Sequence, residues 1–129
     1  MKRTTIIDLL HDSVSKFAEN PFLWEKTNDK FEPTTYKETK QQAYEFAAGL
    51  MSLGVKKGDK IALLSEGRNS WIIGELGILL TGAVNIPLSI KLEESNDLIF
   101  RLQHSEAAYI VVSGGQLKKI HAIQEDLPL

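Results

Sequence analysis

The stretch that decides the fold is Val55–Ser89, VKKGDKIALLSEGRNSWIIGELGILLTGAVNIPLS. Within it, Lys60–Ser65 is an apolar run of strand length, and Ala83–Leu88 is a second one, entered through Gly82. The segment between them, Asn69–Thr81, is apolar almost all round, which is typical of a helix buried on several sides. A strand, about a dozen helical residues and another strand form a crossover unit, which pairs the strands in parallel.

The chain after this unit repeats the same alternation. A helix is expected from Glu93-Glu94 to His104, because the two carboxylates favour a helix N-terminus. Ala107–Val112 (AAYIVV) is then predicted to be a third buried strand. Gly114-Gly115 interrupt the regular structure, and Leu117–Gln124 is predicted to be a helix. The order β-α-β-α-β-α predicts an α/β fold with a layered parallel sheet.

Two helices and a hairpin are expected before the unit. Thr5–Ala18 and Thr35–Leu53 each begin with a capping box and carry an apolar stripe at helical spacing. The stripes are Ile6, Leu10, Val14 and Phe17 in the first helix, and Ala43, Phe46, Ala47, Leu50 and Leu53 in the second. Gly54 with Val55 predicts a Schellman ending for the second helix. Phe22–Lys26 and Lys30–Thr34 predict a β-hairpin around Asn28-Asp29.

Composition excludes several classes of protein. The 129 residues fit one domain, and a net charge of −2 gives no basic footprint for nucleic acid. The absence of cysteine excludes disulfides and thiolate metal sites. No apolar run approaches the roughly 20 residues of a membrane span, and the N-terminus has no apolar signal region. We expect a cytoplasmic protein that binds no nucleic acid.

Two glycine-containing segments invite comparison with phosphate-binding loops. Lys56–Lys60 (KKGDK) lacks the spacing of a P-loop and precedes a strand, so we expect a solvated turn. Gly114-Gly115 does follow a strand and precede a helix, but the third glycine and the acidic residue of a dinucleotide fingerprint are missing. A plain turn is again the favoured interpretation.

Candidate catalytic and metal-binding residues do not form a recognisable set. His11, His104 and His121 show no ligand spacing, so no metal site is predicted. Ser65 and Ser113 each end an expected strand, where a nucleophile elbow would place its serine, but neither lies in a Gly-x-Ser-x-Gly motif. The sequence therefore predicts no catalytic, cofactor-binding or metal-binding residue.

The helix of the central unit carries three residues with a packing interpretation. Trp71 is expected to belong to the core rather than to a ligand platform, because its large area dominates packing. Gly74 and Gly77 each cost about 1 kcal/mol against alanine in a helix. A close approach of a neighbouring helix or strand would explain both glycines.

Four segments, in order, resemble the N-terminal part of the AMP-forming acyl-CoA synthetases of the adenylate-forming superfamily. Thr35–Glu38 is similar to the family's Thr/Ser-Tyr-x-Glu helix opening, and Leu53–Ala62 to its Leu-Gly-Val-x-x-Gly-Asp-x-Val-Ala turn and strand. Trp71 with Gly82–Leu88 is similar to its Trp-containing helix followed by Gly-Ala-Val-x-x-Pro-Leu. His104–Ala107 is similar to its Asp-Ser-x-Ala segment. No single segment is specific, but the ordered set is.

The chain departs from this pattern before the central helix. Many members have Asn before Arg-Pro-Glu-Trp, whereas this chain has Gly67–Trp71, GRNSW. The helix cap is therefore expected on Asn69 or Ser70. The mix of segments looks most like the fatty-acyl, medium-to-long-chain branch.

The resemblance implies an activity for a longer enzyme. Such an enzyme joins ATP and a fatty acid into an acyl-adenylate and then passes the acyl group to coenzyme A, with Mg²⁺ offsetting phosphate charge. The family's phosphate loop, its adenine and ribose motifs and its catalytic lysine match no position here. ATP, Mg²⁺ and coenzyme A are thus expected for the full-length ligase and not for this chain.

The resemblance also implies how the chain is organised. Residues 1–129 are expected to be one α/β fragment of an AMP-binding domain, inactive alone, whose partner is the remainder of the parent chain. Apolar surface left exposed would favour self-association. The alternatives are a self-sufficient nucleotide-binding module of doubly wound type and an interaction domain without a small ligand.

Overall fold

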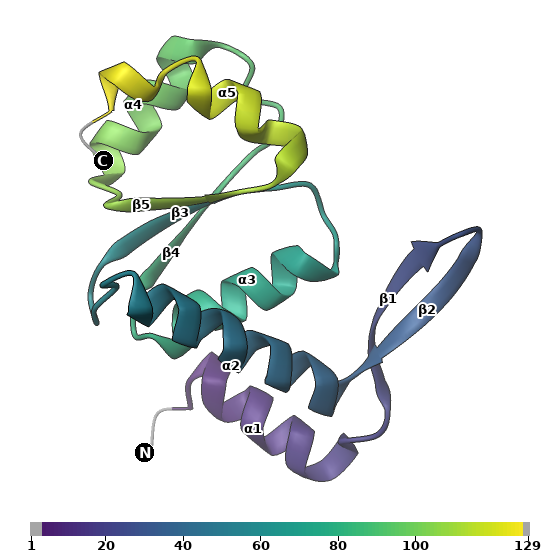
Figure 1. The fold of residues 1–129 in the computed structure, drawn as a ribbon. Coiled ribbons are helices and arrows are strands. Elements are labelled where there is room, and N and C mark those ends of the chain that lie inside the picture. Colours follow the sequence, from purple (N-terminus) through teal and green to yellow (C-terminus); the bar gives the residue numbers. More distant parts are fainter. Residues whose placement is uncertain (1–3, 128–129) are drawn as a thin grey trace.

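The computed structural model describes residues 4–127 (Figure 1). Its elements are α1 Ile6–Phe17, β1 Pro21–Thr27, β2 Lys30–Thr35, α2 Tyr36–Ser52, β3 Lys60–Leu64, α3 Asn69–Leu80, β4 Val84–Leu88, α4 Ser95–Ser105, β5 Tyr109–Val112 and α5 Leu117–His121, with 3-10 turns at Gly114–Gln116 and Gln124–Asp126.

The expected parallel sheet is confirmed. Its three strands lie in the order β4-β3-β5, and β3 pairs in parallel with both neighbours. Leu63 of β3 is aligned with Pro87 of β4 on one side and with Val111 of β5 on the other. The first crossover therefore runs from β3 through α3 to β4, and the second returns through α4 to the opposite side of β3.

The central strand supplies side chains to both faces of the sheet. Ile61 and Leu63 point into a core with α2 and α3, whereas Ala62 and Leu64 point into a core with α4 and α5. All four are at most 1% exposed. This alternation follows from the period of two in a strand. Figure 1 shows the two helical layers on opposite sides of the strands.

A third apolar cluster joins α1 to α2 and α3. It consists of Leu10, Ala43 and Leu76. The predicted stripes are only partly right, because Ile6, Phe17 and Leu53 are 58%, 47% and 72% exposed. Within α1, Leu10 is the stripe residue that is buried against α2 and α3, and Val14 packs beside it.

Both predicted capping boxes and the Schellman ending are confirmed. The Thr5 and Thr35 side chains accept from the backbone N–H groups of Asp8 and Glu38, each at 3.0 Å. The Asp8 and Glu38 carboxylates in turn accept from the backbone N–H groups of the two threonines. At the end of α2, Val55 N–H donates to Leu50 O at 3.2 Å and Gly54 N–H to Met51 O at 3.0 Å. Local chemistry thus sets these helix boundaries.

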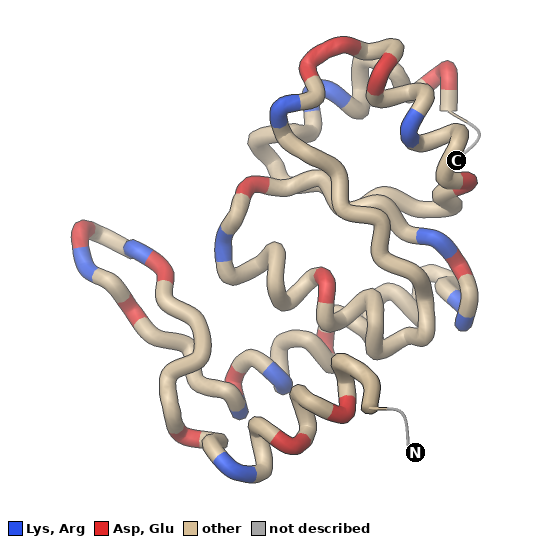
Figure 2. The backbone as a smooth tube through the Cα atoms, turned by 180° about the vertical axis from the view of Figure 1, so that it is seen from behind, with Lys and Arg blue, Asp and Glu red and all other residues tan. Residues whose placement is uncertain are grey.

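The β1–β2 hairpin is also confirmed, and it projects away from the sheet and helices (Figure 1). Asn28 and Asp29 have φ values of 50° and 65°, so both central residues of the two-residue turn are left-handed, as a type I′ turn requires. Charged residues of both signs lie along the tip (Figure 2). At the base of the hairpin, Phe22 stacks on Tyr36 at 4.4 Å between ring centroids.

Three expectations about element ends are wrong. Helix α3 is capped by Arg68 without a side-chain hydrogen bond, not by Asn69 or Ser70. Strand β5 begins at Tyr109 and is half-buried, because it lies at an edge of the sheet. Helix α5 ends at His121, and a 3-10 turn follows. In each case tertiary position overrides a local signal.

Candidate functional site

Polar side chains gather at the carboxyl ends of β3 and β5. The chain leaves β3 towards α3 on one face and leaves β5 towards α5 on the other face. Adjacent strands whose connections diverge in this way create a crevice where open α/β sheets bind ligands. Glu66 and Arg68 follow β3, and Ser113 and Gln116 follow β5.

The Glu66 carboxylate accepts hydrogen bonds from both connections. Ser113 Oγ donates to its Oε2 at 2.6 Å, Gln116 Nε2 donates to its Oε1 at 2.7 Å, and Arg68 Nη2 donates to its Oε2 at 3.0 Å. The hydrogen bond from Gln116, which has the largest effect, and the one from Ser113 lower the pKa of Glu66 to about 2. Glu66 is therefore ionised at neutral pH and joins the two loops.

Gly115 lies directly against this carboxylate. A Cβ atom at position 115 would lie 2.6 Å from Glu66 Oε1, closer than real Cβ contacts allow. A side chain there would displace the carboxylate that Ser113 and Gln116 bind. The absence of a side chain at position 115 thus leaves room for the Glu66 carboxylate in its observed place.

Beside this cluster is a hollow of about 240 Å³ on the α2/α3 face of the sheet. Its walls combine apolar side chains with hydroxyl groups and one guanidinium. The lining residues are Phe46, Leu63, Ser65, Arg68, Ser70, Ile73, Gly74, Val111, Val112, Ser113 and Gly114.

The cluster does not fit acid–base or metal chemistry. The Glu66 oxygens already accept three donors, so the carboxylate is poorly placed to take a proton or to coordinate Mg²⁺. The Ser65 hydroxyl donates to Glu66 O at 3.0 Å and the Ser113 hydroxyl to Glu66 Oε2, so neither has the histidine partner of an activated serine in residues 4–127. Within that range, no three His, Asp or Glu side chains form a metal-binding group.

The two glycine-containing segments are turns. Lys56 N–H donates to Asp59 Oδ2 at 2.8 Å, and Gly58, with φ at 88°, donates to Gly82 O at 3.0 Å. This turn lies at the start of β3, at the opposite end of the sheet from the crevice. Gly114 and Gly115 form a 3-10 turn at the carboxyl end of β5, as the favoured interpretation predicts.

The structure distributes the histidines over three helices. His11 on α1 contacts Tyr44 OH through Nε2 at 2.6 Å, and His104 on α4 stacks on Phe100 at 5.3 Å between ring centroids. His121 is the last residue of α5. Trp71 of α3 is half-buried and packs on the α2/α3 core, in agreement with the packing interpretation.

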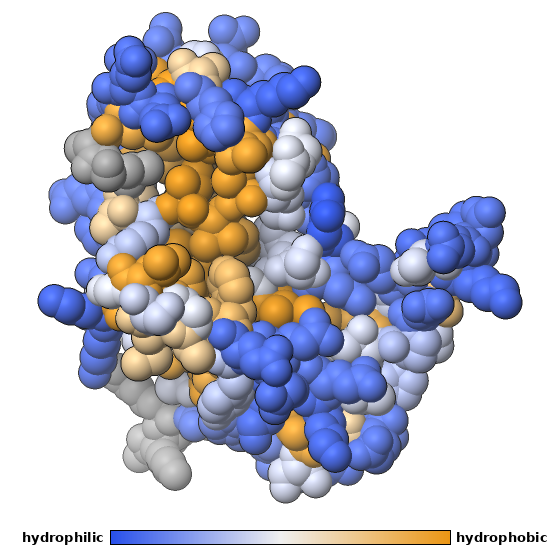
Figure 3. Space-filling view, in the orientation of Figure 1, coloured by the Kyte–Doolittle hydropathy of each residue, from blue (hydrophilic) through white to orange (hydrophobic). Residues whose placement is uncertain are grey.

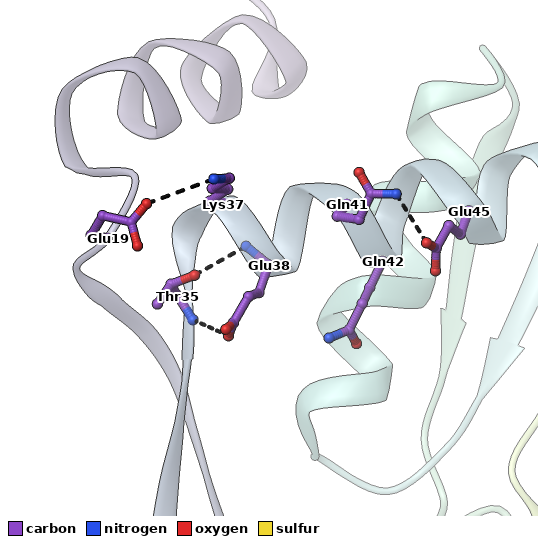
Figure 4. A pocket seen from close by; sticks show the side chains of 7 residues that line it. All are labelled: Glu19, Thr35, Lys37, Glu38, Gln41, Gln42 and Glu45. Atoms are coloured by element: carbon purple, nitrogen blue, oxygen red, sulfur yellow. Dashed lines mark hydrogen bonds and ion pairs between the residues drawn. The ribbon is translucent and has the colours of Figure 1, made fainter.

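A second hollow, of about 380 Å³, lies beside the start of α2 (Figure 4). Its side chains are polar and pair largely with one another. Glu38 belongs to the Thr35 capping box, Gln41 donates to Glu45 at 2.9 Å, and Lys37 lies 3.9 Å from Glu19. These exposed pairs are typical of a solvated helix surface rather than of a reactive site.

Glu66, the centre of the polar cluster, is not among the residues that the sequence patterns point to. Ser113 and Gly115 are recognisable from their motifs, but their common partner Glu66 is not. The signal was present, because Glu66 and Ser113 each follow one of two neighbouring parallel strands. Residues in those positions meet at the carboxyl edge of a sheet.

No helix of residues 4–127 is both long and apolar enough to cross a membrane.

Known proteins similar to this chain are ligases. The chain is 34% identical over 105 residues to a chloroplastic long-chain-fatty-acid–acyl-carrier-protein ligase of Arabidopsis thaliana, covering 81% of this chain and 14% of the relative. It is 29% identical over 127 residues to a long-chain-fatty-acid–CoA ligase of Xenopus laevis, covering 96% of this chain and 17% of the relative. The chain thus spans about a sixth of the length of these relatives.

Solved structures support the fold. An anthranilate CoA ligase in complex with anthranoyl-AMP superposes with a TM-score of 0.84 at 24% identity, covering 95% of this chain and 23% of that one. A putative long-chain-fatty-acid CoA ligase from Rhodopseudomonas palustris gives 0.82 at 20% identity, covering 95% and 30%. At this identity the likeness concerns the fold. The profile of the family described as AMP-binding enzyme matches residues 10–128, and the chain therefore belongs to that family.

Proposed function

We propose that these residues are the N-terminal scaffold of an ATP-dependent fatty acid–CoA ligase of the cytoplasm. The observation that carries this proposal is the family match over residues 10–128, together with relatives named as long-chain-fatty-acid ligases. Because the chain spans about a sixth of those relatives, the reaction would depend mostly on residues that it does not contain. ATP, Mg²⁺ and coenzyme A would serve the longer enzyme.

The site residues support a structural role for this part. Glu66 has three donors within 4–127, and no metal-binding group is present there, so the polar cluster does not fit Mg²⁺ or a reacting carboxylate. What it does is hold the loops after β3 and β5 together. In the longer ligase, this would fix one wall on which the reactive loops rest, with β5 and α3 packed against the remainder.

Titration of the 129-residue chain with ATP–Mg²⁺ by calorimetry tests the scaffold role. We expect no binding in the micromolar range, and no pyrophosphate release with a fatty acid of about 16 carbons present. Micromolar binding or acyl-adenylate formation would overturn the scaffold role.

The natural reading frame tests the ligase assignment separately. We expect coding sequence beyond Leu129 that contains a Thr/Ser-Gly-rich phosphate loop, and ATP-dependent fatty acyl-CoA formation by its product. A natural gene that stops at Leu129 would contradict the assignment.

A self-sufficient nucleotide-binding module is the second candidate function. It is favoured by the hollow at the carboxyl ends of β3 and β5, where Arg68 and three serines lie beside apolar walls. The same calorimetric titration decides between the two candidates, because only this module binds ATP without further residues. Replacing Arg68 with alanine would then weaken that binding.

A further inference from the structure

Three loops leave the carboxyl ends of the parallel strands at one edge of the sheet. They are residues 65–68 after β3, 89–94 after β4 and 113–116 after β5. The hydrogen bonds of Glu66 join the first of these loops to the third. The second loop, residues 89–94, is joined to α5 by a different side chain, that of Lys119.

Lys119 contacts loop 89–94 at two points. Its Nζ donates to Ile90 O at 2.6 Å and lies 3.2 Å from Glu93 Oε1. The Lys119 side chain is 19% exposed, whereas the other cations that form ion pairs in residues 4–127 are between 43% and 71% exposed. A charged donor in a partly buried place forms a stronger hydrogen bond than one in water. The bond to Ile90 O is therefore more than a surface contact.

This inward position is unusual among the charged residues of α4 and α5. Asp97 and Arg101 of α4 and Lys118 of α5 are exposed. Figure 3 shows hydrophilic surface over the outer side of these two upper helices and hydrophobic surface beneath them, towards the sheet. Holding a lysine side chain in one place costs conformational entropy, so the contacts of Lys119 with the loop must offset that cost.

The loop itself has weak internal hydrogen bonds. Lys91 N–H donates to Ser89 Oγ and Leu92 N–H donates to Ser89 O, each at 3.2 Å. Ile90 and Leu92 pack beside the α4/α5 core, while Lys91 between them is exposed. Exposed backbone hydrogen bonds of this kind open readily. The bond from Lys119 to Ile90 O therefore adds a strong contact in the middle of a weakly held turn.

The same turn of α5 also holds the loop after β3. Gln116 Nε2 donates to Glu66 Oε1 at 2.7 Å, and Gln116 precedes Lys119 by three positions. Residues at this spacing are neighbours on one side of a helical turn. The turn itself follows β5. All three carboxyl-end loops thus meet at the start of α5.

We propose that Lys119 is a positioning residue, which fixes loop 89–94 against α5 and makes the three carboxyl-end loops one rigid unit. The inference deepens the proposed scaffold role and rests on it for its purpose. Open α/β sheets bind their ligands at this edge. An edge whose loops are already ordered loses less conformational entropy when a ligand binds, and it holds the groups that rest on it in a fixed geometry.

Hydrogen exchange and limited trypsin digestion of the 129-residue chain test this role. In the parent, the amides of Lys91 and Leu92 should be protected, and trypsin should cut slowly after Lys91. Lys119→Met keeps the length of the side chain without its charge. Exchange at the two amides and cleavage after Lys91 should then each rise about 10-fold, the scale expected for the loss of a hydrogen bond from a charged donor. Amides of β3 should exchange as in the parent, because the change is local.

Two matched variants separate the bond to the carbonyl from other effects of charge. Lys118→Met removes the same charge from the exposed neighbour and should leave the loop as protected as in the parent. Glu93→Gln removes the charged partner, whose side chain is 74% exposed, but keeps the bond from Lys119 to Ile90 O. Because exposed ion pairs contribute little, this variant should change exchange in the loop by less than about 2-fold.

Chemical rescue distinguishes a positioning ammonium group from side-chain packing. The chain contains no cysteine, so Lys119→Cys introduces a single thiol. Alkylation with 2-bromoethylamine in urea, followed by refolding, restores an ammonium group at the length of lysine, whereas iodoacetamide gives a neutral side chain. The ammonium form should regain the parental protection of loop 89–94 to within about 2-fold, because the charged donor is again present. The neutral form should remain as open as Lys119→Met.

Fast exchange of Lys91 and Leu92 in the parent overturns the role of Lys119, and this measurement requires no variant to fold. An unchanged loop in Lys119→Met also overturns it, as does an equal opening in Lys118→Met or Glu93→Gln, or an ammonium form without rescue. Circular dichroism checks that each variant is folded. Titration with ATP–Mg²⁺ measures a different property, so failure of the positioning role and failure of the proposed function are distinguishable.

Discussion

At the scale of single residues, Gly77 sets how closely α2 and α3 approach. A Cβ there would lie 2.6 Å from Phe46 Cδ1 and 3.2 Å from Ala43 O. The close-approach interpretation is thus right for Gly77. At Gly74 a Cβ would meet Leu63 Cδ1 at 3.8 Å, an ordinary contact, so the interpretation does not hold there.

Gly77→Ala should therefore destabilise the protein by about 1–3 kcal/mol, as overpacking does in cores. Gly49→Ala is the matched control, because position 49 is exposed in α2 with nothing within 4 Å of a Cβ. That change should stabilise by about 0.5–1 kcal/mol through helix propensity. Urea denaturation measures both, and stabilisation by both changes would show that Gly77 does not limit the approach of the helices.

Glu66 gives the stability of the fold a pH dependence. Its pKa falls from an ordinary value of 4.5 to about 2 in the folded chain. A carboxyl group with a lowered folded pKa stabilises above its unfolded pKa, and that stability is lost as pH falls through the folded value. Glu66→Gln should lower the urea midpoint at pH 7, and the gap from the parent should shrink between pH 4.5 and about 2.

Glu32→Gln on the exposed hairpin is the control for this measurement. A gap between parent and Glu66→Gln that stays constant down to pH 2 would contradict the role of the carboxylate in joining the two loops.

At the scale of elements, the junction between the hairpin and α2 depends on Thr35. Its Oγ1 accepts from Glu38 N–H at 3.0 Å, while Glu38 Oε2 accepts from Thr35 N–H at 3.0 Å. Thr35→Ala should cost about 1 kcal/mol by leaving a helix N–H group without its acceptor. Thr34→Ala, in the same strand without a capping role, should cost less in the same urea experiment, and equal losses would argue against the cap.

The start of α3 receives its hydrogen-bond acceptor from the hairpin. Arg68 is the capping residue, but its side chain forms no hydrogen bond with the backbone N–H groups at the start of the helix. Instead Asn69 N–H donates to Glu25 Oε1 of β1 at 3.2 Å. A carboxylate at a helix N-terminus is favourable, so the hairpin stabilises the helix at its base.

At the scale of the whole molecule, β3 couples the two cores. Leu63 is 1% exposed in the α2/α3 core and Leu64 is fully buried in the α4/α5 core. Leu63→Ala and Leu64→Ala should each destabilise by about 2–5 kcal/mol. Because the two side chains belong to one strand, either change should lower the unfolding midpoint of both layers together.

Trp71 reports on the α2/α3 core when the exposed Trp24 is replaced by phenylalanine. In that background, the fluorescence and far-ultraviolet circular dichroism curves of the Leu64→Ala variant should coincide. Separate transitions would show that the layers unfold independently.

The sequence by itself determined the elements and the family. The alternation of apolar residues predicts the three strands and the helices between them, and the threonine caps, the Schellman ending and the I′ turn each lie within a few residues. Such signals are local, so one sequence contains them in full. The ordered segments that resemble acyl-CoA synthetases likewise agree with the family match.

Only the tertiary structure decided which strands are edges, which apolar residues stay exposed and what Glu66 does. The hydrogen bonds of Glu66 join residues 47 and 50 positions apart, and the bond from Asn69 to Glu25 spans 44. No periodicity records such pairs, because they form only when packing brings distant loops together. The half-buried β5 and the exposed Leu53 have the same cause, since propensity specifies an element but neighbouring elements decide how much of it is covered.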